Sequence, residues 1–138
     1  MNKKKETIMT VALTLSLLPE TFAICRLEPG TPLHDLQKGG SFFSITSTMD
    51  ELSVVCPVDS IPSTEIKADR DWSCFKLHGP FPFDLVGILN SVTAPLAEAK
   101  VGIFAISTYD TDYVLVKQEL LESAIAALRK AGHTVYTD

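Results

Sequence analysis

The segment 77–85 (LHGPFPFDL) predicts the end of a strand, a Gly-Pro turn and the start of a helix in quick succession. Backbone N–H groups in the first turn of a helix have no acceptor within the helix, so they attract an anionic group such as a carboxylate. We expect Gly79 and Pro80 to form the turn, and the rings of Phe81 and Phe83 to shield a bound anion from water. This segment therefore predicts one half of a site for a small charged molecule.

A second polar segment, 107–112 (STYDTD), lies between two apolar runs. An acidic side chain of this segment, Asp110 or Asp112, could pair with an ammonium or guanidinium group, which the hydroxyls of Ser107, Thr108 and Thr111 could orient. One segment thus suits a carboxylate and the other a cation, and an amino acid carries both. Together the two segments predict an amino-acid-binding site.

Both segments also have purely structural interpretations. The first can be a rigid strand–helix turn with core aromatics, in which the Asp84 carboxylate satisfies the helix donors. The second can be a hairpin with a polar tip. Asp110 and Asp112 could also suggest a pair of metal ligands, but no further carboxylate or histidine lies nearby in the sequence. A polar turn is therefore favoured, and we expect no metal ion.

Catalysis finds little support in the sequence. His34, His78 and His133 stand alone, and each is expected to be a solvated or singly hydrogen-bonded surface residue. The GxSxG, P-loop and GxGxxG motifs are absent. An enzyme built on Asp110, Asp112 and His78 would lack a base oriented by a partner. We expect a protein that is not an enzyme and uses no cofactor.

Composition narrows the partners and the compartment. A net charge of −5 over 138 residues argues against a nucleic-acid partner, since the one basic run, Lys3–Lys5, is too short to bind phosphates. No apolar run approaches the length of a transmembrane helix, so no membrane partner is expected. The three cysteines form no CxxC pair. Because Cys25 and Cys56 lie in apolar runs, we expect buried, inert thiols and a reducing, cytoplasmic compartment.

The amino-terminal stretch has a basic start and an apolar centre, as a secretory signal does. Glu6 interrupts the basic region, however, and apolar residues alternate with Thr and Ser between Val11 and Leu17. Such alternation is typical of a half-buried strand. We therefore expect a strand over Thr10–Leu18 rather than a cleaved signal.

In its second half the sequence predicts the element order β-α-β-β-α-β, which is the ferredoxin-like plan. Pro95 lies inside the first predicted helix and removes the hydrogen bond to the Ser91 carbonyl, so we expect a kink or an early end there. The expected elements are a strand over Trp72–His78, a helix over Phe83–Ala99, strands over Val101–Ile106 and Tyr113–Val116, a helix over Gln118–Ala131 and a strand over His133–Tyr136.

The first half predicts strands without comparable helices. A single helical turn is expected over Leu33–Lys38, and the polar segment Asp59–Asp71 is expected to link the halves. The expected strands cover Thr10–Leu18, Thr21–Leu27, Ser41–Thr48 and Glu51–Pro57.

The two halves are similar enough to predict a degenerate tandem duplication. FSITSTMDELSVV, which begins at Phe43, aligns with FAISTYDTDYVLV at an offset of 61, placing Glu51 opposite Asp112. CRLEPGTP aligns with FKLHGPFP at an offset of 50. The offset grows between these two alignments, in the region where the second half has its first predicted helix. The first copy is therefore expected to have a shorter helix at that place. Each small unit would then supply burial that the other lacks.

At the level of whole motifs, the sequence resembles the ACT domain family. The resemblance is carried by FDLVGILNSVTAPLAEAKVGIFAISTYDTDYVLV and the later AGHTV, and most specifically by ISTYDTDYVLV. LPETFAICRLEPG, GGSFFSITSTMDELSVVCP and DWSCFKLHGPFPF in the remaining sequence also look like this family. The chain is most similar to small bacterial proteins with two ACT-like units, which resemble the ACT units of aspartokinases and of animal cytosolic arginine sensors.

The resemblance implies an α+β fold of tandem ferredoxin-like ACT-type units. We expect a degenerate first unit with shortened helices over residues 1–66 and a second unit over residues 67–138. It also implies a regulatory, ligand-binding role without catalysis. In the arginine sensors, the turn matching Gly79–Phe83 and the acidic position matching Asp112 contribute to the pocket.

The expected protein is thus an amino-acid sensor, a homodimer in which the ligand is held at an interface between ACT units. Most ACT proteins carry a catalytic or DNA-binding domain, whereas the two expected units account for all 138 residues, so the regulated protein partner is left open. The alternative is a structural interaction module that binds no ligand.

Overall fold

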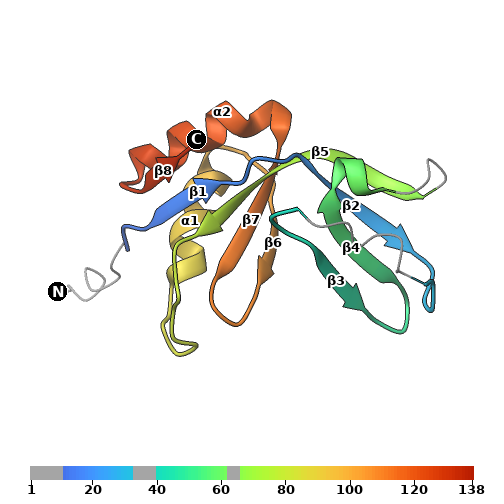
Figure 1. Cartoon of the computed structure of the whole chain (residues 1–138). Helices are drawn as coiled ribbons and strands as arrows, with labels where there is room; N and C mark the ends of the chain where they lie inside the picture. Colours follow the sequence, from blue (N-terminus) through green and yellow to red (C-terminus); the bar gives the residue numbers. More distant parts are fainter. Residues whose placement is uncertain (1–10, 33–39, 62–65) are drawn as a thin grey trace.

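All eight strands that the structure describes belong to one continuous sheet, and two helices cover part of it (Figure 1). The structure is a computed structural model, and it describes residues 11–32, 40–61 and 66–138. The strands are β1 (Thr14–Leu17), β2 (Phe22–Leu27), β3 (Ser44–Ser47), β4 (Leu52–Pro57), β5 (Lys67–Leu77), β6 (Phe104–Ser107), β7 (Asp112–Lys117) and β8 (Thr134–Tyr136). The helices are α1 (Ile88–Glu98) and α2 (Leu121–Lys130), with short 3₁₀ turns η2 (Val58–Ser60) and η3 (Gln118–Leu120).

Strand β5 serves both halves of the chain. Its first residues pair with β2, and its last residues pair with β7 on one edge and β1 on the other. The first half therefore has the strand order β5-β2-β4-β3, and the second has β8-β1-β5-β7-β6. With β1 set aside, each half has a ferredoxin-like order, which confirms the predicted α+β class and its ferredoxin-like units.

Two features of this sheet differ from the sequence-based expectation. Residues Lys67–Asp71, expected in a linker, form the start of β5 and pair with β2. The charged residues of this segment are typical of a linker, but charged side chains are also common in a strand that lies at the solvent-exposed edge of a sheet. Strand β1 lies between β5 and β8, antiparallel to one and parallel to the other, so it belongs to the second half's sheet. The predicted helical turn at Leu33–Lys38, His34 and the residues before Val11 lie outside the described residues.

Helix α1 begins at Ile88, five residues later than expected. The preceding Gly87 has a φ of 89°, a left-handed conformation that favours glycine and separates the helix from the turn before it. Leu85, inside the range expected to be helical, precedes the helix and is 48% exposed. The helix continues beyond Pro95 to Glu98, so the predicted early end is wrong.

His133 explains how the helix tolerates Pro95. Proline has no N–H to donate to the Ser91 carbonyl four residues earlier. The His133 ring lies 2.7 Å from that carbonyl through Nε2, while its Nδ1 lies 3.0 Å from the donating N–H of Leu13. These contacts require that Nε2 carry the proton and donate. His133 is only 4% exposed, so the expectation of a surface residue is wrong for this histidine. His133 directly precedes β8, and its ring joins α1, through Ser91, to the residue before β1, Leu13.

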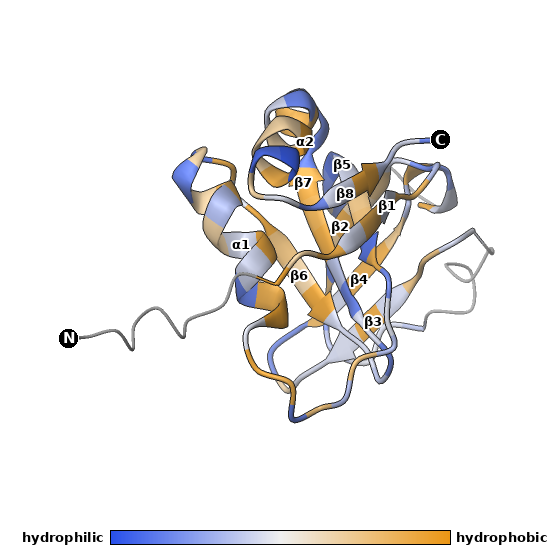
Figure 2. Cartoon of the chain, turned by 90° about the vertical axis from the view of Figure 1, so that its left-hand side faces the viewer, coloured by the Kyte–Doolittle hydropathy of each residue, from blue (hydrophilic) through white to orange (hydrophobic). Residues whose placement is uncertain are grey.

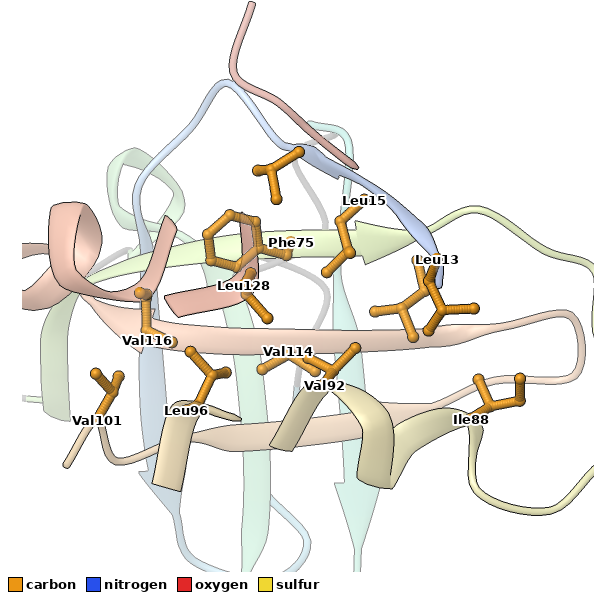
Figure 3. Close-up of a cluster of buried hydrophobic side chains, with 13 residues drawn as sticks. Leu13, Leu15, Phe75, Ile88, Val92, Leu96, Val101, Val114, Val116 and Leu128 are labelled. Carbon is orange, nitrogen blue, oxygen red and sulfur yellow. The ribbon is translucent and has the colours of Figure 1, made fainter. Parts of the chain in front are cut away.

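Both helices pack on the same face of the second half's sheet, over its principal hydrophobic core (Figure 3). Strands β6 and β7 are largely hydrophobic beside α1 (Figure 2). The buried members of this core are Leu13, Leu15, Phe75, Leu77, Ile88, Val92, Leu96, Val101, Val114, Val116, Ala124, Leu128 and Val135. No helix among the described residues is long and apolar enough to cross a membrane.

The first half has a smaller core, and no α-helix of the described residues belongs to that half. Ala23, Cys25, Leu52, Val54 and Cys56 are buried there. Side chains from connecting segments pack against this cluster, including Phe43, Val58, Ile61 and Ile66. A third cluster, which includes Phe22, Val55 and Leu115, joins the two halves.

The cysteines are buried and free, as predicted for Cys25 and Cys56. Burial, with a smaller contribution from the Glu20 carboxylate, raises the pKa of Cys74 to about 12. This shift disfavours the thiolate, which is the reactive form of cysteine.

The internal repeat is present, but its offset is 60 rather than 61. Strands β6 and β7 begin 60 residues after β3 and β4, at Phe104 against Ser44 and Asp112 against Leu52. The turns agree: the Thr48 N–H donates to the Glu51 carbonyl as the Thr108 N–H donates to the Thr111 carbonyl. The alignment of apolar residues in the sequence is therefore shifted by one residue. In a strand, a shift of one residue moves every side chain to the opposite face of the sheet. Asp112 therefore corresponds to Leu52, not to Glu51.

Candidate functional site

The two polar segments meet at one end of the sheet, where the loop after β5 and the β6–β7 turn point the same way (Figure 1). The Phe81 N–H donates to the Asp110 carbonyl at 2.9 Å, and the Thr111 hydroxyl donates to the Leu77 carbonyl at 2.7 Å. The approach is close, because a Cβ added to Gly79 would lie 2.8 Å from the Asp110 carbonyl oxygen. Glycine is therefore required where the loop touches the turn.

A cavity of about 210 Å³ lies between the loop and the turn. Six of the eight predicted site residues line it: Phe81, Phe83, Ser107, Thr108, Thr111 and Asp112. Gly79 and Pro80 do not line it; Gly79 instead sets the close packing of the loop on the turn. Sequence reasoning missed Pro82, Leu85, Ile88, Tyr109 and Asp110 as lining residues. All but Ile88 lie within the two segments singled out, whereas Ile88 depends on where α1 begins.

The amino terminus of α1 lies beside this cavity. Ile88, its first residue, lines the cavity, and the first helical hydrogen bond runs from the Ser91 N–H to the Gly87 carbonyl. The N–H groups before Ser91 therefore have no acceptor within the helix. No side chain caps this end and its first turn holds no acidic residue. Asp84 lies outside the helix, so the predicted competition from its carboxylate does not arise there.

Carboxylates lie on the turn side of the cavity. Asp112 is half-buried and accepts a hydrogen bond from the Ser107 hydroxyl, while Asp110 is exposed. The hydroxyl of Thr108 donates to the Thr111 carbonyl. The hydroxyl protons of Ser107, Thr108 and Thr111 are thus used within the protein, where they hold the turn and orient Asp112. In the described part of the chain, no group of three or more His, Cys, Asp or Glu side chains could hold a metal ion.

Three of the residues that line the cavity are exposed large apolar side chains. The rings of Phe83 and Tyr109 pack edge to face with centroids 4.9 Å apart, and they are 75% and 80% exposed. Leu85 also lines the cavity, and Val86, which follows it in the chain, is 88% exposed. We name these four residues the apolar rim. An exposed apolar cluster beside a cavity is typical of a surface that a partner or ligand covers.

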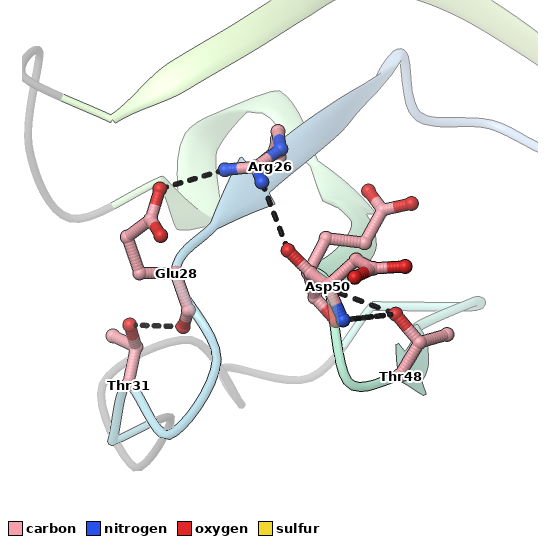
Figure 4. Close-up of polar contacts among 6 residues, drawn as sticks. Arg26, Glu28, Thr31, Thr48 and Asp50 are labelled. Carbon is pink, nitrogen blue, oxygen red and sulfur yellow. Dashed lines mark hydrogen bonds and ion pairs between the residues drawn. The ribbon is translucent and has the colours of Figure 1, made fainter.

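In the first half, an arginine side chain contacts the turn that corresponds to the β6–β7 turn (Figure 4). Asp50 corresponds to Asp110 at the offset of 60, and its carbonyl accepts a 3.0 Å hydrogen bond from the Arg26 guanidinium. Arg26 also forms a 2.8 Å ion pair with Glu28. The two copies of the turn are therefore alike in backbone but not in what approaches them.

Family models match most of the chain in two parts. The model for the ACT domain matches residues 67–130, and a model described as an N-terminal domain matches residues 20–64. The solved structure of protein Atu0741 from Agobacterium tumefaciens is 41% identical, covers 93% of this chain and 95% of that chain, and has a TM-score of 0.86.

Two further similarities extend to larger proteins. Clostridium acetobutylicum aspartate kinase is 16% identical over 92% of this chain and 37% of that chain, with a TM-score of 0.65, a similarity of fold alone. The human cytosolic arginine sensor for mTORC1 subunit 1 is 31% identical over 97 residues, which are 63% of this chain and 30% of that protein. The chain spans about half or less of the length of the curated relatives that it matches. From the ACT model and the fold together, residues 67–130 of the chain form an ACT domain.

Proposed function

We propose that the chain binds an amino acid in the cavity between the β5–α1 loop and the β6–β7 turn, and that this binding regulates a partner without catalysis. The observation that carries the proposal is the pairing of opposite groups across one cavity. The uncapped amino terminus of α1 suits the α-carboxylate, and Asp112 suits the α-ammonium or a cationic side chain.

The relatives support a regulatory role. The matching human protein is named as an arginine sensor, and the Clostridium enzyme is described as allosteric. The name of the human protein also places it in the cytosol, and the three free cysteines of this chain are consistent with a cytoplasmic, reducing compartment.

We propose that a second copy of the chain packs on the apolar rim. The proposed division after residue 66 gives two ACT-like units, with β1 in the sheet of the second and the start of β5 in the sheet of the first. The ligand is held where a second-unit cavity faces a neighbouring unit. The rim side chains would then be buried between copies of a homodimer. Binding can regulate only if the ligand prefers one assembly or partner state over another.

The test is thermal unfolding in the presence of each of the twenty amino acids, on the native chain and on Asp112→Asn. One or two amino acids are expected to raise the midpoint, because a ligand that binds only the folded state stabilises it, by about 2.7 kcal/mol at 100 times its dissociation constant. Asp112→Asn keeps the shape of the side chain and removes its charge, so this rise is expected to disappear.

Asp59→Asn is the matched control, since Asp59 is exposed in η2 and does not line the cavity. It should respond to the same amino acid as the native chain. A flat response of the native chain to all twenty amino acids would rule out the proposed site.

An interaction module without ligand is the second candidate, favoured by the exposure of the apolar rim. It predicts association that amino acids do not change. Val86 belongs to the rim but does not line the cavity, so Val86→Asp is expected to weaken association measured by sedimentation while leaving the cavity residues in place. If Val86→Asp associates as the native chain does, the rim is not the interface.

A further inference from the structure

A second, larger cavity of about 800 Å³ lies away from the candidate amino-acid site. Strands β2, β3, β4 and β5 of the first half contribute to it, and so do the start of β6 and the end of β7. The two cavities share no lining residue. Any ligand bound here would therefore be recognised by a different set of groups.

A row of hydrogen-bond donors crosses four strands at this cavity. The strand registers pair Thr46 with Ser53, Ser53 with Arg26 and Arg26 with Lys67. Residues paired across neighbouring strands have their side chains on the same face of a sheet. All four line the cavity. We name these residues, Thr46, Ser53, Arg26 and Lys67, the donor row: two hydroxyls, a guanidinium and an ammonium group.

The two cations of this row face each other across a strand pair. Like charges directly opposite on neighbouring strands are destabilising unless something compensates them. Arg26 is partly compensated by its ion pair with Glu28, whose side chain is 81% exposed. Lys67 forms no ion pair with another residue in the described ranges. An anion bound between Arg26 and Lys67 would remove the repulsion.

Acidic groups also line the cavity, namely Glu51, Asp69 and Asp71. Asp69 is already engaged, since it accepts hydrogen bonds from the Lys117 ammonium at 2.6 Å and the Trp72 indole at 3.2 Å. The Lys117 hydrogen bond holds the pKa of Asp69 below its ordinary value. The basic side chains Arg26, Lys67, Arg70 and Lys117 outnumber these three, although acidic residues exceed basic ones, 17 to 12, in the whole chain.

We propose that the donor row binds a compact anion with several oxygen atoms, such as a phosphate group or a polycarboxylate. Oxygens of such an anion accept from the guanidinium and the ammonium in charge-assisted hydrogen bonds and from the hydroxyls beside them. Phe104 and Ile24, which also line the cavity, provide apolar walls for the remainder of the ligand. This site is separate from the amino-acid site and does not depend on it.

Titration with sodium phosphate and with sodium citrate, each against sodium chloride at equal ionic strength, tests the proposal. A saturating rise of the unfolding midpoint at millimolar concentration is expected with at least one of them, and the stronger of the two identifies the ligand as a phosphate or a polycarboxylate. Lys67→Ala is expected to raise the apparent dissociation constant about tenfold, since a charged hydrogen bond contributes roughly that factor. Thr46→Val should weaken binding by a smaller factor.

Lys76→Ala is the matched control, because Lys76 is exposed on the same strand and does not line the cavity. An equal response in Lys67→Ala and Lys76→Ala would mean that the anions stabilise the chain nonspecifically, and it would overturn the site. So would a midpoint that neither anion raises above sodium chloride. Asp112→Asn should keep the anion response and Lys67→Ala the amino-acid response, so failure of one site is distinguishable from failure of the other.

Discussion

Replacing His133 with alanine is expected to lower the free energy of unfolding by about 3–5 kcal/mol. The substitution leaves the buried Leu13 N–H and the Ser91 carbonyl without their partner and opens a cavity between α1 and the sheet. An unsatisfied buried polar group costs about 1–3 kcal/mol, so two of them account for most of the effect. Urea unfolding at neutral pH, followed by circular dichroism, measures it.

Pro95→Ala provides a sharper version of the same experiment. Alanine at position 95 restores an N–H that can donate to the Ser91 carbonyl within the helix. In this background His133→Ala leaves only the Leu13 N–H unsatisfied, and its cost is expected to fall by about 1–3 kcal/mol. Additive effects of the two substitutions would contradict the assigned role of the imidazole.

His78→Ala is the matched control for histidine. His78 is exposed, and its hydrogen bond is with the Ser16 hydroxyl at 2.6 Å on the surface. Its removal is expected to cost less than about 1 kcal/mol. A cost as large as that of His133→Ala would mean that burial is not what distinguishes the two histidines.

Gly79→Ala is expected to destabilise the chain by about 1–3 kcal/mol and to abolish its response to amino acids. The added methyl group would lie 2.8 Å from the Asp110 carbonyl oxygen and 3.1 Å from Cβ of Thr111, so backbone must move. This movement separates the loop from the turn, breaks the hydrogen bond from Phe81 to Asp110 and changes the shape of the cavity. Urea unfolding and the amino-acid titration measure the two effects.

Gly102→Ala is its control, because a Cβ there meets nothing within 4 Å. The control should unfold within about 1 kcal/mol of the native chain and keep the ligand response. If Gly79→Ala behaves like Gly102→Ala, the close packing of loop and turn is not needed for the site.

Local patterns were sufficient for much of the second half. The apolar spacing, acidic start and basic end of the last helix predict Gln118–Ala131, and the structure has η3 followed by α2 over Gln118–Lys130. The same kind of signal singled out the two segments that line the candidate site. These features depend on neighbours within a few residues, so the sequence alone could determine them.

Tertiary structure decided what depends on residues far apart in the chain. Lys67–Asp71 form a strand because β2 pairs with them, and the position of β1 between β5 and β8 depends on both partners. His133 is buried against α1, where its ring contacts the carbonyl of Ser91, 42 residues away in sequence. The donor row exists only through the registers of four strands, which bring Arg26 opposite Lys67. Composition and periodicity contain no information on such pairings, because a strand's partner and register are set by the packing of the whole sheet.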